Sequence, residues 1–255
     1  MLTPLDRLPV WWEAGLLFAA MLVAFELAMR LPSTGSTGEG GKEAYLVSAA
    51  IGLLALLLGF TFNLALSHYD LRQALVVREA TAIADVARRL DLLAPPQRAR
   101  TKAILVRYAR SRVALALAGE DRPTIARVEA MSRAEARTLW ATVAPTVTTA
   151  GADSWLVQPL DDMFSLAVGR RAALASRIPT QVASVLGLYA VITAAILGYA
   201  IAYGRLRHRV ATTALFALLA ITVGLILDLD RPRNGFILIN QQPLRDELVN
   251  LQAGA

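Results

Sequence analysis

The sequence YLVSAAIGLLALLLGFTFNLAL, residues 45–66, contains no charged side chain from end to end. A helix rises about 1.5 Å per residue, so about 20 residues cross the hydrocarbon core of a membrane, which is about 30 Å thick. Apolar runs of similar length lie at residues 10–31, 182–204 and 210–227. These four runs predict an integral membrane protein with four transmembrane helices.

The composition agrees with this prediction. Hydrophobic residues make up 56% of the 255 residues and the mean hydropathy is +0.48, whereas soluble domains are about 45 to 50% apolar. The chain has no cysteine, which excludes disulfides, thiolate metal sites and cysteine nucleophiles. Among 26 basic residues only Lys42 and Lys102 are lysine, a bias that indicates GC-rich codon usage and a bacterial source.

A polar block, residues 67–181, separates the second and third apolar runs and predicts a soluble helical domain. Apolar residues recur there at helical spacing, without strand-like alternation. Prolines and glycines predict helices over 70–93, 97–118, 124–143 and 153–177, with breaks at 119–123 and 145–152. We therefore expect an all-α integral membrane protein. Its parts are a first transmembrane hairpin (1–66), the inserted soluble domain (67–181), and a second hairpin with a C-terminal tail (182–255).

Charged residues near the membrane ends predict the orientation. Glu13 and Glu26 lie near the ends of the first run, where their side chains can reach the headgroups. An N-terminus in the cytoplasm places nine basic residues on that side near membrane ends and five on the other. The positive-inside rule then predicts cytoplasmic termini in a bacterial inner membrane, although the basic loop 205–209 opposes this assignment.

Small residues form stripes on three of the apolar runs, at Gly52, Ala55, Gly59, Asn63 and Ser67, at Ala190, Ala194, Gly198 and Ala202, and at Thr213, Ala217, Ala220, Gly224 and Asp228. Such stripes let helices approach closely in lipid, so ordinary helix packing accounts for them. Two of the stripes carry a polar group, Asn63 or Asp228, which is costly in a membrane unless it faces protein or water. A water-lined path or an oligomer axis is therefore the functional alternative.

The most polar segment follows the fourth run and reads DLDRPRNGF, residues 228–236. Asp228 and Arg231 are one helical turn apart, so we expect them to form an ion pair. Pro179, Pro232 and Gly235 then act as structural junctions that break or turn the chain. The alternating charges would also suit a gate at a pore mouth.

No pattern for a cofactor or metal appears in the chain. The glycine-rich stretch 31–41 lacks the spacing of a phosphate-binding loop and reads as a flexible connector. His68 and His208 are expected at opposite membrane faces, so we assign no metal. No nucleophile and base stand at a recognisable spacing, so we do not expect an enzyme, a cofactor or a nucleic-acid partner.

Three stretches, residues 59–93, 163–179 and 228–244, resemble the bacterial membrane proteins described as bestrophin-like. The resemblance rests on the Glu79-Ala80 pair and on a D-x-D-x-P-x-x-G sequence that begins at Asp228. It implies kinship with bestrophins, pentameric anion channels with four membrane helices per subunit and a cytosolic helical domain between the second and third. The side chains taken as pore or gate candidates are Asn63, Asp70, Arg72, Glu79, Asp228, Asp230 and Arg231.

The leading hypothesis is a homo-oligomeric channel for small inorganic anions, whose second span lines the pore with Asn63 facing it. The formal net charge of +6 favours anions. The alternative is a non-conducting membrane scaffold or sensor whose helical domain binds a cytosolic partner.

Overall fold

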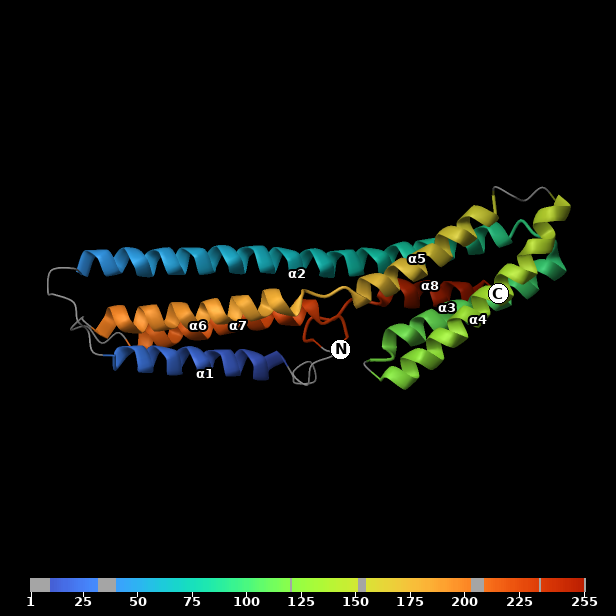
Figure 1. The fold of residues 1–255 in the computed structure, drawn as a ribbon. Coiled ribbons are helices and arrows are strands. Elements are labelled where there is room, and N and C mark those ends of the chain that lie inside the picture. Colours follow the sequence, from blue (N-terminus) through green and yellow to red (C-terminus); the bar gives the residue numbers. More distant parts are fainter. Residues whose placement is uncertain are drawn as a thin grey trace. The chain divides into compact units, whose positions relative to one another are not determined.

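The computed structural model describes residues 10–31, 40–119, 121–150, 155–202, 209–233 and 235–254. These residues form α-helices and their connections, and no strand occurs among them (Figure 1). The helices are α1 (Val10–Met29), α2 (Gly40–Leu90), α3 (Pro95–Leu117), α4 (Arg122–Ala150), α5 (Val157–Ala175), α6 (Thr180–Ala202), α7 (Arg209–Asp230) and α8 (Gln242–Ala253).

Four segments are long and apolar enough to cross a membrane: Trp11–Met29, Tyr45–Leu90, Val157–Ala202 and Arg209–Asp230. The predicted all-helical chain with four such segments is confirmed, whereas the inserted soluble domain stays a prediction. Most of the glycine-rich connector and of the basic loop 205–209 lies outside the described residues.

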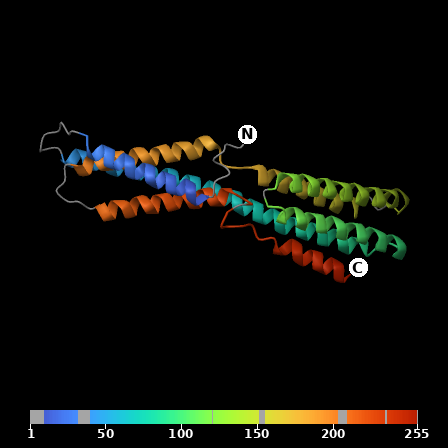
Figure 2. The same ribbon diagram turned by 90° about the horizontal axis from the view of Figure 1, so that it is seen from below.

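The chain divides into two compact units. Unit 1 comprises residues 1–68, 177–231 and 235–237, and unit 2 comprises residues 69–176, 232–234 and 238–255. In unit 1, α1 packs against both α6 and α7. Figures 1 and 2 show these three helices bundled with the N-terminal half of α2.

Unit 1 exposes apolar side chains over much of its surface. Leu16 is 64% exposed on α1, Leu188 60% on α6 and Leu218 64% on α7. Exposed leucines along several helices are unfavourable in water, because burying apolar surface drives folding there. Lipid removes that cost, so this surface agrees with a membrane-embedded bundle.

Unit 2 has an apolar core between the C-terminal half of α2 and helices α3, α4, α5 and α8. Its fully buried members include Ile83, Leu105, Leu139, Leu160 and Leu244. On α2, Val76, Ala80, Ile83, Val86 and Leu90 contribute to this core. Their spacing of three and four residues is the period that places side chains on one helical face.

Three details differ from the sequence predictions. Pro95 and Pro96 begin α3 rather than precede it, because a proline in the first turn needs no N–H partner. Pro145 lies inside α4, which continues to Ala150 although the proline cannot donate an intrahelical hydrogen bond. Helix α8 was not expected, and it buries Leu244 and Leu251 on one face.

Candidate functional site

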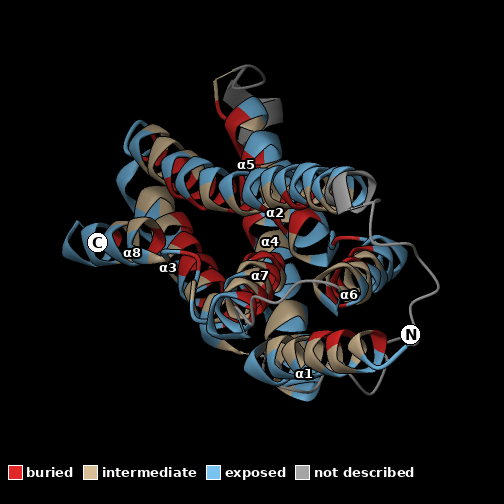
Figure 3. Ribbon diagram, turned by 90° about the vertical axis from the view of Figure 1, so that its left-hand side faces the viewer, coloured by how far each residue is buried: buried red, intermediate tan, exposed pale blue. Residues whose placement is uncertain are grey.

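The first candidate site is one face of α2. Gly52, Gly59, Asn63 and Asp70 lie on this face, and all four are exposed (Figure 3 shows the exposed turns of α2). A Cβ atom added to Gly52 or Gly59 would meet nothing within 4 Å. We call these four residues, with Ala55 and Ser67, the open face of α2.

The packed side of α2 lies away from the open face. Leu54 is 1% exposed, Leu58 7% and Ala65 0%, which anchors this part of the helix in unit 1. Thr61 satisfies its hydroxyl within the helix by donating to the carbonyl of Leu57 at 2.8 Å. The contrast between the two sides shows that the small residues of the open face do not pack inside the subunit.

Most of the small residues of α6 and α7 pack inside the subunit, whereas Ala202 and Thr213 at one end of each stripe are exposed. Ala190 and Ala194 of α6 are 1% and 0% exposed. A Cβ atom on Gly198 would overlap the backbone of Phe25, and one on Gly224 would stand 3.1 Å from the Cβ of Ala14. These glycines therefore serve the close packing of α6 and α7 against α1.

The second candidate site is the polar run that follows α7. The Asp228 carboxylate accepts hydrogen bonds from the backbone N–H groups of Phe236 at 2.8 Å and Ile237 at 2.9 Å. A Cβ atom on Gly235 would stand 2.9 Å from Asp228 Oδ1 and 3.0 Å from its carbonyl oxygen. Gly235 is thus needed for a close approach to Asp228, and the two residues together fix the turn around Pro232.

Asp230 ties α7 to the start of α6. Its carboxylate accepts the backbone N–H of Ile178 at 3.0 and 3.1 Å, and its Oδ1 lies 3.6 Å from Nδ1 of His68. Pro179 follows Ile178, and its carbonyl accepts the N–H of Val182 as the helix begins. The residues singled out in the sequence as structural junctions therefore lie at two helix ends, Pro179 before the start of α6 and Pro232 and Gly235 after the end of α7.

The ion pair expected between Asp228 and Arg231 is not the one that forms. Arg231 donates to the carboxylate of Glu13 on α1, whereas Asp228 binds the two backbone N–H groups. The carboxylate of Asp228 therefore has its hydrogen bonds without the guanidinium.

The opposite end of α1 carries a second ion pair with α7. Nη2 of Arg209 lies 3.6 Å from Oε2 of Glu26, and both side chains are well exposed. Glu13 begins α1 and pairs with the end of α7, whereas Glu26 is near the end of α1 and pairs with the start of α7. The two helices are therefore antiparallel and carry an ion pair at each end.

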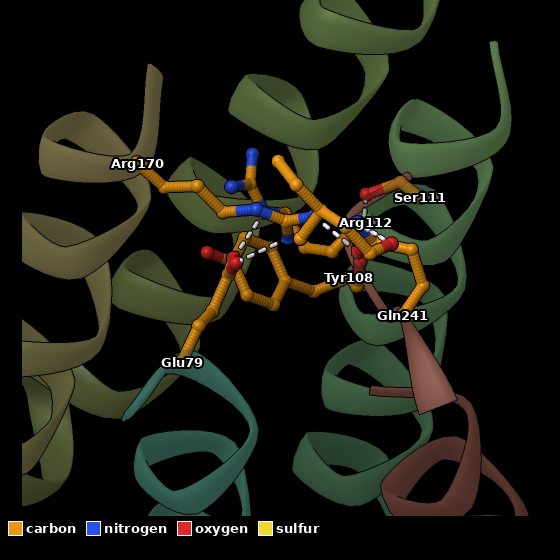
Figure 4. A network of polar contacts seen from close by, with 7 residues as sticks. Glu79, Tyr108, Ser111, Arg112, Arg170 and Gln241 are labelled. Carbon is orange, nitrogen blue, oxygen red and sulfur yellow. Dashed lines mark hydrogen bonds and ion pairs between the residues drawn. The ribbon is translucent and has the colours of Figure 1, made fainter. Parts of the chain in front are cut away.

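A third candidate site is the buried network around Glu79 in unit 2 (Figure 4). Arg112 of α3 donates to Oε1 of Glu79 through its Nε, and Arg170 of α5 donates to Oε2 at 2.6 Å. Arg170 also donates to the side-chain carbonyl of Gln241 at 2.6 Å. Gln241, which precedes α8, is in turn fixed by a 3.2 Å hydrogen bond to the carbonyl of Ile239.

The negative charge of Glu79 keeps Arg112 ionised although the side chain is buried. Burial alone would lower the pKa of Arg112, but the nearby Glu79 carboxylate raises it above its ordinary value. Tyr108 packs beside these side chains, and burial raises the pKa of its hydroxyl. The network therefore holds charged guanidiniums beside a neutral phenol.

Arg72 has a capping role in unit 2. Its Nε donates to the carbonyl of Ala173 at 3.1 Å and its Nη2 to the carbonyl of Ser176 at 2.5 Å. These carbonyls stand at the C-terminal end of α5, where helices lack intrahelical donors. A buried cation there also complements the helix dipole.

The structure thus distributes the candidate residues over three places. Asn63 and Asp70 lie on the open face of α2, Asp228, Asp230 and Arg231 lie at the end of α7, and Arg72 and Glu79 lie inside unit 2. Sequence reasoning missed the partners of these residues, namely Glu13, Tyr108, Arg112, Arg170 and Gln241. The signal available for Arg112 and Arg170 was an arginine within an apolar helical pattern.

Comparison with known proteins identifies the family. A family model for the Bestrophin-like domain matches residues 15–244. No match was found among curated proteins, and none among solved structures. The match covers most of the chain and includes all three candidate sites. With its four long apolar helices, this membrane protein belongs to the bestrophin-like family.

Proposed function

We propose that the protein is a homo-oligomeric channel for small inorganic anions in a bacterial inner membrane, and that the open face of α2 lines its pore. The observation that carries this proposal is the exposure of Gly52, Gly59 and Asn63 on a helix whose other side is packed. The glycines of the comparable stripes on α6 and α7, Gly198 and Gly224, instead pack against α1 within the subunit.

The energetic argument concerns Asn63. An amide at membrane depth is costly in contact with lipid, because lipid offers no hydrogen-bond partner. The exposed glycines beside it leave room for another backbone to approach. A ring of subunits that turn α2 toward the central axis places Asn63 in water and removes the open face from contact with lipid.

Anion selectivity is proposed from the charge balance and the family. The chain carries a formal net charge of +6, and basic residues outnumber acidic ones. Fixed positive charge near a pore raises the local concentration of anions. Asp70 on the open face opposes this field, so Asp70→Asn should increase the preference for anions.

The decisive experiment combines ion flux with single cysteines, which are easily introduced because the chain has none. Purified protein in liposomes should conduct chloride, and a water-soluble thiol reagent should block flux in Asn63→Cys. Ile221→Cys is the matched control, since Ile221 is 65% exposed on the apolar surface of α7 and faces lipid in this proposal. Block of both variants, or of neither, contradicts the pore assignment.

Subunit counting separates the two candidate functions. Mass photometry in detergent should give a closed oligomer at all working concentrations. A monomer would remove the channel proposal, because four spans with so few polar residues cannot enclose a water-filled path alone. An oligomer without ion flux would favour the scaffold or sensor that binds a cytosolic partner.

Orientation is proposed with both termini in the cytoplasm. In unit 1 the start of α1, the start of α6 and the end of α7 gather at one end, around Glu13, Ile178 and Arg231. Ala99→Cys, at an exposed position of α3, should react with an impermeant reagent only in opened vesicles, whereas Tyr45→Cys should react in intact cells. The reverse pattern would place the termini outside.

A further inference from the structure

We propose that the network around Glu79 is a binding site for a small monovalent anion such as chloride. Two arginines meet one carboxylate there. The side chains of Arg112 and Arg170 are 7% and 6% exposed, and that of Glu79 is fully buried. Glu129 lies near Arg112 but is itself paired with Arg171 at 3.2 Å. The described residues therefore leave one surplus positive charge at this site.

Hydrogen-bond donors are in surplus as well. Tyr108 is only 1% exposed. Its buried hydroxyl has no hydrogen-bond partner among the described residues. Arg112 uses one of its three side-chain nitrogens, Nε, for the hydrogen bond to Glu79. Both carboxylate oxygens of Glu79 and the side-chain oxygen of Gln241 already have a donor.

These surpluses define the missing group. A buried charge or donor without a partner costs free energy. A bound group that is negative and accepts hydrogen bonds would remove this cost. One surplus charge fixes the valence at one. The enclosed position of the Tyr108 hydroxyl requires a small ion, and Figure 4 shows its ring among Glu79, Arg112 and Arg170. Because burial raises the pKa of Tyr108, its hydroxyl keeps its proton at neutral pH and can donate it.

The test is thermal unfolding of the full-length protein in detergent, in sodium chloride and in sodium gluconate of equal ionic strength. A ligand that binds the folded state raises Tm with its concentration. For a chain of this size the rise should reach about 5 to 10 °C at a hundredfold excess over Kd. Gluconate is too large for the site and should give no rise. The binding does not require conduction, so the test is independent of the channel proposal.

Tyr108→Phe is the informative variant, because it removes the unpartnered hydroxyl and keeps the ring. It should melt at or above the wild-type Tm in gluconate and lose most of the rise in chloride. Tyr69→Phe is the matched control, since Tyr69 also packs against the core of unit 2, and it should keep the full rise. Arg112→Gln should abolish the rise; if that variant does not fold, Tyr108→Phe decides.

Three results would overturn the proposal. The first is a wild-type Tm that is equal in chloride and gluconate. The second is a Tyr108→Phe variant that retains the whole rise in chloride. The third is a Tyr108→Phe variant that is equally destabilised in both salts, which would assign the hydroxyl a water molecule in place of an anion.

Discussion

Asp228 and Arg231 show how one turn of helix can hold two separate interactions. Asp228 closes the turn after α7 through backbone N–H groups, and Arg231 reaches across to Glu13. Neighbouring opposite charges on a helix usually suggest a local pair worth a few tenths of a kcal/mol. Here Arg231 instead reaches a segment 218 residues away, and Asp228 binds the backbone eight and nine residues further along the chain.

A double-mutant cycle distinguishes these partners. Glu13→Gln and Arg231→Gln should each lower Tm, and the double variant should lose less than the sum, with a coupling of about 0.5 to 3 kcal/mol. Asp228→Asn and Arg231→Gln should be additive within about 0.5 kcal/mol. Coupling between Asp228 and Arg231, without coupling between Glu13 and Arg231, would contradict this prediction and indicate a local ion pair between Asp228 and Arg231.

The pair at the other end of α1 provides an internal control. Glu26 and Arg209 are exposed and 3.6 Å apart, so Glu26→Gln should cost about 1 kcal/mol or less. If Glu26→Gln lowers the free energy of unfolding as much as Glu13→Gln does, burial does not set the strength of these ion pairs.

Gly235 should tolerate no side chain. In Gly235→Ala the new Cβ meets both the carboxylate and the carbonyl of Asp228, so we expect a loss of about 1 to 3 kcal/mol and a lower Tm. Gly254→Ala is the control, because its Cβ would stand 3.6 Å from the nearest atom, the carbonyl of Asn250. Equal melting of the two variants would remove the packing role of Gly235.

Single residues were predictable from sequence only in part. The chain marks Asp228, Asp230 and Glu79 as unusual, because each is a carboxylate beside an apolar helical pattern. It does not name their distant partners, since Asp230 is separated from Ile178 by 52 residues and Glu79 from Arg170 by 91. Helical periodicity relates only positions about one turn apart.

Among the helices, α2 and α6 carry similar stripes and use them differently. Gly198 of α6 lies against the backbone of Phe25, whereas Gly59 of α2 faces open space. Sequence spacing places small residues on one face of a helix but does not say what covers that face. The difference therefore appears only when the helices are assembled.

This difference predicts opposite effects of one substitution. Gly198→Ala forces α6 away from α1 and should destabilise the protein by about 1 to 3 kcal/mol. Gly59→Ala meets no atom of its own subunit and should keep subunit stability or raise it by up to about 1 kcal/mol, the gain in helix propensity. Thermal unfolding measures both effects. A larger loss at Gly59 would mean that neighbouring subunits approach α2 at that glycine.

The apolar helices were predictable because their length and hydrophobicity are properties of contiguous sequence. Helix α8 was not, since it has only 12 residues and follows a segment dominated by polar and proline signals. The predicted break at Pro145 was wrong for a related reason. A proline predicts a helix end, but contacts in the folded chain can stabilise a helix that continues beyond the proline.

At the scale of the whole molecule, the two ion pairs between α1 and α7 bear on how the protein fits a lipid bilayer. Glu13 and Glu26 are 13 positions apart, about 20 Å along α1. Arg209 begins α7 and Arg231 directly follows it, so these two are about 33 Å apart at the helical rise. A typical hydrocarbon core is about 30 Å thick. The pairs therefore draw polar groups of α1 to depths that acyl chains would normally occupy.

Hydrophobic mismatch of this kind is relieved when the surrounding bilayer thins. The protein reconstituted in phosphatidylcholines of increasing acyl-chain length should show its highest Tm in the thinner bilayers. Replacing both Glu13 and Glu26 by Gln should move that optimum toward thicker ones, whereas an unchanged optimum would show that other helices set the preferred thickness. The two glutamates near the ends of α1 would then determine the bilayer thickness that the protein prefers, and would favour thin regions of its membrane.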